Sequence, residues 1–240
     1  MLAIAVFNFK GGTGKSTTTL NLGACLARHQ IPTVAVDLDG QRTLSFGLGM
    51  DGVTPTALDW LSGDPNALAN TSQANLALIP GDIGLFRLDA DKGMFGKAVK
   101  GIRGYDVLMM DCSPGLGVAS VQALLNCDRV LLPTLCEPAA LKGVSEAVSL
   151  IRDERADVPI DVVRVRYKPR LVLTREVDDL LVESAEDLGY RLLHATIPEN
   201  IAVAESIAHQ QPISNYAPKS SGALAYGSLA KEISKVWGLR

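Results

Sequence analysis

The chain has 240 residues, of which 47% are hydrophobic and 20% charged, and its formal net charge is −3. This composition allows one large core, and the slight acidity excludes a protein coated with basic charge, although not a local basic patch. Four cysteines without a C-x-x-C pair and three scattered histidines argue against structural zinc and favour buried free thiols. No linker-like stretch divides the sequence, so we expect residues 1–240 to form a single domain.

The first predicted element is an apolar strand at Leu2–Asn8, too short to span a bilayer and without the features of a signal peptide, as in a cytoplasmic protein. A glycine-rich turn and a helical pattern follow it. Residues 51–75 favour an excursion of helix and loop. The remaining predictions are a helix at Lys15–His29, strands at Thr33–Val36, Asp106–Met110, Arg129–Pro133 and Leu171–Thr174, and helices at Val177–Leu188 and Ser221–Val236.

Continuous apolar strands that alternate with helices are typical of a parallel sheet covered on both faces. The sequence therefore predicts an α/β fold with a doubly wound, mostly parallel sheet. Right-handed crossovers would bring the carboxyl ends of the strands, and any ligand, to one edge of that sheet.

The turn after the first strand has the composition of a phosphate-binding loop. Its glycines let backbone N–H groups approach a phosphate, and the following helix adds its positive dipole. Lys15 is placed to bridge the β- and γ-phosphates, and the Ser16 hydroxyl to ligate Mg²⁺. The alternative is a strand–helix turn that binds nothing. We expect ATP and Mg²⁺ to be bound by Lys10, Gly11, Gly12, Thr13, Gly14, Lys15, Ser16 and Thr17.

Two predicted strands end in carboxylates. Asp39 follows the second strand, and Asp111 ends the strand that begins near residue 106. Carboxylates beside a phosphate loop are placed to hold the waters of Mg²⁺ or to orient an attacking water. A buried Asp111 without a cation or hydrogen bonds is costly, although it could instead cap the next helix. We predict a magnesium site at Ser16, Asp39 and Asp111.

The loop departs from the general G-x-x-x-x-G-K-[ST] pattern, because Phe9 stands where the first glycine is expected and Lys10 precedes the remaining glycines. This deviant loop resembles that of the ParA/Soj/MinD family of P-loop ATPases. The resemblance implies that Lys10 reaches the nucleotide of a second copy, which makes ATP binding and homodimerisation one event. A cation supplied in this way neutralises charge on the transferred phosphate.

The resemblance includes the segment after the second strand. Asp37, Asp39 and Gln41 match the family motif D-x-D-P-Q, with Gly40 in place of the proline. The resemblance implies that Asp39 positions the hydrolytic water, so the expected catalytic set is Lys10, Lys15 and Asp39. Gly40 is expected to leave this backbone looser than a proline would.

Most of the remaining chain is similar to the same family. Residues 105–114 resemble its Y-D-x-x-x-x-D-x-P-P segment, and residues 130–143 resemble V-L-x-P…E…A-L-x-G. Residues 196–200 resemble its I-P-R-N segment, which implies that Pro198 and Asn200 contact adenine.

The family resemblance implies a slow ATPase that acts as a switch. Its ATP-bound dimer would bind DNA non-specifically and associate with the nucleoid, and a ParB-like partner would stimulate hydrolysis. The cargo is left open among a plasmid, a chromosome and a protein body such as a carboxysome. We expect no separate DNA-binding extension, because the first strand begins at Leu2.

A basic cluster is the candidate DNA surface. It consists of Arg164, Arg166, Lys168 and Arg170, whereas Glu199 stands where the family often has a basic residue. Several such charges on one face suffice for non-specific binding through counterion release. The alternative is a solvated basic edge strand.

Two rival functions follow from relatives in the same family. A MinD-like membrane-cycling regulator would need a basic amphipathic tail, for which residues 236–240 leave little room, so we expect no membrane partner. A protein like the nitrogenase iron protein would need cluster cysteines, and Cys112 and Cys136 are not spaced for that role.

Overall fold

The computed structural model describes residues 1–64, 66–89 and 93–239. One eight-stranded sheet runs through it in the order β3-β4-β2-β5-β1-β6-β7-β8. The strands are β1 (Leu2–Val6), β2 (Thr33–Leu38), β3 (Ala69–Asn70), β4 (Leu76–Ile79), β5 (Val107–Cys112), β6 (Arg129–Leu135), β7 (Ile160–Tyr167) and β8 (Arg191–Pro198).

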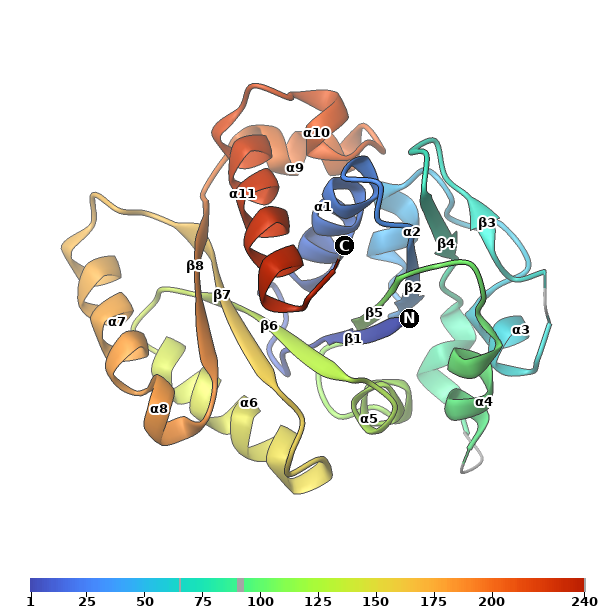
Figure 1. The fold of residues 1–240 in the computed structure, drawn as a ribbon, viewed down its shortest axis with the longest axis horizontal. Helices are drawn as coiled ribbons and strands as arrows, with labels where there is room; N and C mark the ends of the chain where they lie inside the picture. Colours follow the sequence, from blue (N-terminus) through green and yellow to red (C-terminus); the bar gives the residue numbers. More distant parts are fainter. Residues whose placement is uncertain (65, 90–92, 240) are drawn as a thin grey trace.

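Helices cover both faces of the sheet (Figure 1). On one face lie α1 (Lys15–Arg28), α2 (Thr43–Gly47), α9 (Ile201–Ala208), α10 (Ile213–Tyr216) and α11 (Ser221–Val236). The remaining helices are α3 (Ala57–Leu61), the 3-10 helix η1 (Ile83–Arg87), α4 (Met94–Gly101), α5 (Val118–Leu125), α6 (Ala140–Glu154), α7 (Val172–Glu183) and α8 (Ala185–Leu188).

Strand pairing confirms the predicted doubly wound sheet. β1 lies between β5 and β6 and is parallel to both. Among the described strands the one antiparallel pair is β3 with β4. Because β1, β2 and β5 run in the same direction, their carboxyl ends meet at one edge of the sheet.

The central strand, β1, shows why strands of this sheet appear in the sequence as continuous apolar runs. Ala3, Ala5 and Phe7 belong to the core on one face, and Ile4 and Val6 to the core on the other. A strand buried on both sides has no polar face, so its sequence does not alternate. All four cysteines are likewise buried and free, as expected.

One predicted strand is wrong. Of residues 171–174, Leu171 is the N-cap of helix α7 and the other three are its first residues, and the buried positions of the helix, Thr174, Val177 and Leu181, have helical spacing. The apolar run that suggested a strand is largely exposed: the exposed fractions of Leu171, Val172 and Leu173 are 51%, 59% and 48%.

Several elements were not predicted. β7 and β8 carry charged residues that interrupt their apolar pattern, and β4 is short. The excursion at 51–75 contains α3 and β3, with Pro65 outside the described residues. By contrast, the terminal helix spans Ser221–Val236 as predicted.

The carboxyl end of α11 is fixed at the edge of the sheet opposite the strand ends named above. The Trp237 indole Nε1 donates a 2.8 Å hydrogen bond to Asp161 Oδ2. Arg129 Nη1 lies 2.9 Å from the same oxygen, and Asp161 is fully buried. An aromatic N–H and a charged partner thus satisfy this buried carboxylate oxygen and dock the last helix.

Within the described residues, no helix combines the length and the apolar character needed to cross a bilayer. Arg240, the last residue of the tail considered for membrane binding, lies outside the described part of the chain.

Candidate nucleotide site

The connection between β1 and α1 has the backbone of a phosphate-binding loop. Gly12 and Gly14 have φ values of +74° and +80°, in the left-handed region that favours glycine. A Cβ on Gly12 would meet nothing within 4 Å, so this side of the loop faces open space. Helix α1 begins directly after Gly14 and directs its N-terminal dipole toward that space.

A cavity of about 690 Å³ lies against this loop. That volume suits a nucleotide-sized ligand. Of the residues predicted from the sequence, the structure brings together Gly12, Gly14, Lys15, Ser16, Thr17, Asp39, Pro198 and Asn200 around it. Residues from the first helix, the second strand end and the segment after β8 therefore converge on one site.

The two loop lysines have different surroundings. Lys15 is 6% exposed, and its Nζ donates a 2.9 Å hydrogen bond to the backbone oxygen of Lys10. Burial lowers the pKa of Lys15, and the nearby Asp111 carboxylate opposes that shift. A buried ammonium held at the loop favours an anion in the adjoining space.

Lys10 does not line the nucleotide cavity. Its Nζ lies 3.5 Å from the Ala139 oxygen, in a small separate cavity of about 50 Å³ at the start of α6. A Cβ on Gly143 would stand 3.0 Å from that nitrogen, so the lysine side chain runs directly over this glycine. In one copy of the chain, the amine of Lys10 is therefore directed away from its own nucleotide site.

Three aspartates meet at the carboxyl ends of β2 and β5. Asp37 pairs in register with Asp111 on the neighbouring strand, and Asp39 follows two residues later. Asp37 accepts hydrogen bonds from Ser45 N and Ser45 Oγ at 2.8 and 2.7 Å, and from Asp39 N at 3.1 Å. Asp37 is thus a structural neighbour of the site, a role that the D-x-D motif alone did not assign.

Asp111 is the carboxylate whose surroundings fit a cation. It is fully buried, its Oδ1 is 3.4 Å from Thr19 Oγ1, and its Oδ2 has no hydrogen-bond partner among the described residues. Burial raises the pKa of Asp111 well above its ordinary value, and the Asp37 charge raises it further. A bound cation would remove both penalties.

The donor set fits Mg²⁺ bound mainly through water and phosphate. The described residues contain no group of three or more His, Cys, Asp and Glu side chains placed to hold a metal. Mg²⁺ commonly keeps several waters and takes few ligands from the protein, so the Ser16 hydroxyl and the Asp111 carboxylate suffice on the protein side.

The segment after β2 forms a tight turn. Arg42 N donates to the Asp39 backbone oxygen at 2.9 Å, and Gln41 N donates to Asp39 Oδ1 at 2.9 Å. The Asp39 side chain is 7% exposed and lines the nucleotide cavity. The turn therefore fixes one oxygen of Asp39 and leaves the other without an intramolecular hydrogen bond among the described contacts.

The far wall of the cavity comes from β8 and the C-terminal helices. Asn200 Nδ2 donates a 2.7 Å hydrogen bond to Ser221 Oγ, which fixes the amide beside the cavity. Tyr226, which sequence reasoning missed, lines the cavity, and its hydroxyl lies 3.5 Å from Thr18 Oγ1. Neither motif spacing nor hydrophobic periodicity distinguishes Tyr226 from an ordinary core residue of α11.

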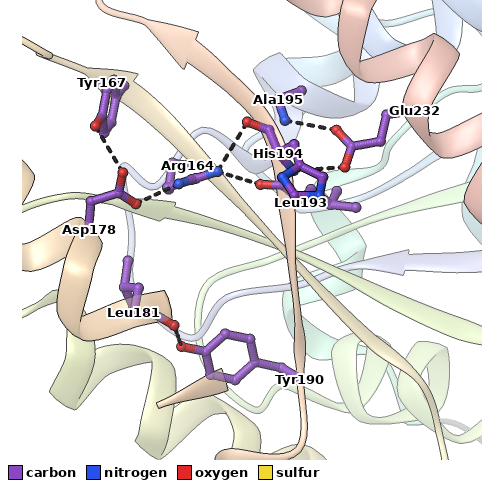
Figure 2. Close-up of polar contacts among 9 residues, drawn as sticks. All are labelled: Arg164, Tyr167, Asp178, Leu181, Tyr190, Leu193, His194, Ala195 and Glu232. Carbon is purple, nitrogen blue, oxygen red and sulfur yellow. Dashed lines mark hydrogen bonds and ion pairs between the residues drawn. The ribbon is translucent and has the colours of Figure 1, made fainter. Parts of the chain in front are cut away.

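The assignment of Arg164 to a DNA surface is wrong. Arg164 is 7% exposed, and its guanidinium forms an ion pair with Asp178 of α7. It also donates to the backbone oxygens of Leu193 and His194 on β8 (Figure 2). A side chain whose donors are directed at internal acceptors is not available to phosphates.

The other members of the cluster remain near the surface. Arg166 Nη2 lies 3.1 Å from Glu199 Oε1, and Lys168 Nζ lies 2.9 Å from Glu199 Oε2. Arg170 is exposed in the loop before α7. One carboxylate thus balances part of the positive charge that the sequence suggested.

Comparison with known proteins agrees with this geometry. Residues 1–160 match the model of a family described as an AAA domain. The chain is 32% identical over 248 residues to the sporulation initiation inhibitor protein Soj of Bacillus subtilis, covering 96% of this chain and 97% of that protein. It is 30% identical to the chromosome partitioning protein ParA of Caulobacter vibrioides, with 96% and 92% coverage.

Comparison with a solved structure also relates the chain to this group of proteins. The septum site-determining protein MinD of Pyrococcus horikoshii, complexed with Mg-ADP, matches with a TM-score of 0.83 and 31% identity, covering 99% of this chain and 98% of that one. The sequence matches and the shared fold agree with a phosphate loop placed beside paired strand-end carboxylates. The chain belongs to the ParA/Soj/MinD family of deviant Walker A ATPases.

Proposed function

We propose that residues 1–240 act as a single ATPase domain whose ATP-bound form is a homodimer, and that this dimer binds DNA non-specifically to position a cargo. A ParB-like partner stimulates hydrolysis and resets the cycle. The observation that carries the proposal is the placement of the two lysines: Lys15 lies in the nucleotide cavity, whereas Lys10 is directed out of it. A cation outside its own site is free to serve a second copy.

The residues of the site have distinct parts in hydrolysis. Loop N–H groups and Lys15 hold the phosphates, and Ser16 with Asp111 holds Mg²⁺, which neutralises phosphate charge when bound. Asp39 orients a water for in-line attack on the γ-phosphorus, and the bond to the bridging oxygen breaks to give ADP and phosphate. Pro198 and Asn200 contact the base.

Three substitutions test this scheme in one set of assays. Lys15→Ala is expected to abolish Mg-ATP binding in calorimetry, because the buried ammonium is lost. Lys10→Ala is expected to keep binding but lose both the ATP-induced dimer and hydrolysis. Asp39→Ala is expected to bind ATP and persist as a dimer in size-exclusion chromatography.

The matched control is Lys142→Ala, since Lys142 lies on α6 near Lys10 but is 79% exposed at its side chain. It should behave as the unmodified protein in all three assays. A Lys10→Ala protein that still dimerises with ATP contradicts the proposed role in trans, and folded protein without Mg-ATP affinity contradicts the whole scheme.

The proposed DNA surface consists of the basic cluster without the buried Arg164. Arg166 lies near the end of β7 and also lines the nucleotide cavity, and Lys168 and Arg170 lie in the loop between β7 and α7. Replacing all three by alanine should abolish ATP-dependent retention on DNA and flatten its dependence on salt. Retention that survives this triple substitution removes the surface from the proposal.

A second candidate function is a membrane-cycling regulator of the MinD kind. The 31% identity to the septum site-determining protein of Pyrococcus horikoshii supports this alternative. Sedimentation with anionic liposomes in the presence of ATP separates the two: pelleting with liposomes supports membrane cycling, and retention on DNA alone supports partitioning.

A further inference from the structure

The glycine in the turn after β2 is explained by a neighbouring side chain. Gly40 stands where the family motif has proline, yet its φ is not among the left-handed values that require glycine. Its amide donates no hydrogen bond among the described backbone contacts, so the backbone loses nothing if that amide is replaced by a proline ring. Backbone geometry therefore does not account for glycine at this position.

The ring of Phe86 occupies the space beside Gly40. A Cβ built on Gly40 would stand 2.6 Å from both Cδ2 and Cε2 of that ring, and 2.9 Å from Cζ. These distances are far below van der Waals contact, so the ring lies directly against the glycine. Phe86 is nevertheless 57% exposed, which means that packing into the core does not explain its position.

The short helix that carries Phe86 is anchored to the carboxylate site. Its buried residue is Leu85, and its first turn is capped by Asp82, whose side chain accepts from Gly84 N at 2.7 Å. Just before it, Gly81 N donates to Ser45 Oγ at 2.8 Å, and this hydroxyl donates to Asp37. The ring is thus presented to the turn from a segment tied to the same strand ends.

The turn under the ring holds the carboxylate proposed for catalysis. The hydrogen bond from Arg42 N to the Asp39 oxygen makes Gly40 the second residue of a four-residue turn, where proline is favoured because it restricts φ. Glycine at this position allows more backbone freedom than proline. A contact beyond the two hydrogen bonds of the turn would restrict this backbone further, and with it the orientation of Asp39.

We propose that Phe86 is a positioning residue for ATP hydrolysis: its ring, packed on Gly40, restricts the turn from Asp39 to Arg42 as a proline ring at residue 40 would. Phe86 is not among the residues that line the nucleotide cavity, so its side chain acts through the turn. This inference rests on the proposed role of Asp39. It also states that Phe86 matters only because residue 40 is glycine.

The test is a double-mutant cycle on the full chain, with kcat and KM for ATP as readouts. Phe86→Ala is expected to lower kcat by about tenfold, with KM changed less than twofold, since displacing a catalytic group by about 1 Å can cost roughly a hundredfold. Phe86→Ala combined with Gly40→Pro is expected to return kcat to within about twofold of the unmodified protein, because the pyrrolidine replaces the lost restraint. In the Gly40→Pro background the proline Cβ must displace the Phe86 ring, so Phe86→Ala should not lower kcat any further there.

The control is Ile83→Ala. Ile83 lies on the same short helix and is 63% exposed, so the substitution removes a similar apolar group that is not among the atoms nearest to Gly40. Hydrogen exchange at the Arg42 amide gives a readout that does not depend on hydrolysis. Exchange should accelerate in Phe86→Ala, return toward normal in the double variant, and stay normal in Ile83→Ala.

Three results would overturn the inference: an unchanged or increased kcat in Phe86→Ala, no recovery in the double variant, or an equal loss in Ile83→Ala. Asp39→Ala in the same assay separates this inference from the proposed function. Normal hydrolysis by Asp39→Ala removes the role of Asp39. Lost hydrolysis in Asp39→Ala together with normal hydrolysis in Phe86→Ala removes only the role of Phe86.

Discussion

At the scale of single residues, Asp111 combines full burial with an oxygen that lacks a hydrogen-bond partner among the described residues. Because its pKa is raised above the ordinary value of 3.8, the folded protein binds this proton more tightly than the unfolded chain does. Without Mg²⁺, its contribution to stability is therefore greatest below the unfolded pKa and is lost as the pH rises through the folded value. A cation bound to the ionised carboxylate would offset this loss of stability.

Asp111→Asn should therefore stabilise the nucleotide-free protein at pH 8 and abolish magnesium-dependent hydrolysis. We expect a rise of a few degrees in the unfolding midpoint, since about 1 kcal/mol corresponds to roughly 2–4 °C in a protein of this size. The gain should shrink as the pH falls toward 4, because the folded carboxyl is then protonated and the unfolded one has begun to bind its proton. Asp106→Asn, at the exposed opposite end of the same strand, is the control; equal gains in both variants contradict the argument.

Residues of the phosphate loop could be predicted from the sequence because their chemistry depends on local order along the chain. Gly12, Gly14, Lys15 and Ser16 lie together in any fold that places a strand before them and a helix after them. Arg164 could not be placed in the same way. Its immediate neighbours, Val163 and Val165, are apolar, but further basic residues follow at positions 166, 168 and 170. The acceptors that bury it lie on α7 and β8, 14 and 29 residues further along the chain.

At the scale of elements, β8 contains an irregularity that Arg164 and Glu232 hold in place. The register passes from Val162 opposite Leu192 to Arg164 opposite Thr196, so β8 has two additional residues. Arg164 donates to the backbone oxygens of this bulge, and the Glu232 carboxylate accepts from His194 N and Ala195 N at 2.7 and 2.8 Å (Figure 2). Carbonyl and N–H groups of the bulged backbone thereby both have hydrogen-bond partners.

Arg164→Ala should destabilise the protein strongly, because it leaves Asp178 without its cation and two backbone oxygens without donors. The expected loss is about 3–5 kcal/mol in the free energy of unfolding, measured by urea denaturation. Arg170→Ala removes the same side chain from an exposed loop position and should stay within about 0.5 kcal/mol of the unmodified protein. Equal denaturation midpoints for the two variants contradict the buried role of Arg164.

The elements that sequence reasoning identified are those with one unbroken period. β1 is a continuous apolar run, β5 is apolar up to Asp111, and α11 has a clear helical stripe. β7 alternates charged and apolar residues although its first six residues are buried, because Asp161 and Arg164 are paired inside the fold. When charged residues of a strand are buried in ion pairs with distant elements, the sequence pattern alone does not identify that strand.

At the scale of the whole molecule, the net charge is −3, so attraction to a polyanion depends on the local balance between positive and negative side chains in the basic cluster. Glu199 lies within ion-pair distance of both Arg166 and Lys168, and these two residues hold its pKa below the ordinary value. Glu199 is therefore ionised at neutral pH and competes with phosphate for the same cations. On the proposed function, it limits how tightly the ATP-bound form holds DNA.

Glu199→Gln should increase ATP-dependent retention on DNA. Freeing one or two cations should steepen the slope of log affinity against log salt concentration by about 0.9 for each new phosphate contact. Glu186→Gln on α8 changes the net charge equally at an exposed position and is the control. Retention that rises equally in both variants shows an effect of net charge alone, and the local argument then fails.

The docking of α11 through Trp237 also gives the molecule a built-in optical reporter. The chain has two tryptophans: Trp60 belongs to the core on one face of the sheet, and Trp237 to the core on the other. Each indole is nearly shielded from water, so each emits at short wavelength until its own layer opens. With Phe in place of one tryptophan, the fluorescence of the other follows the opening of a single layer of the fold.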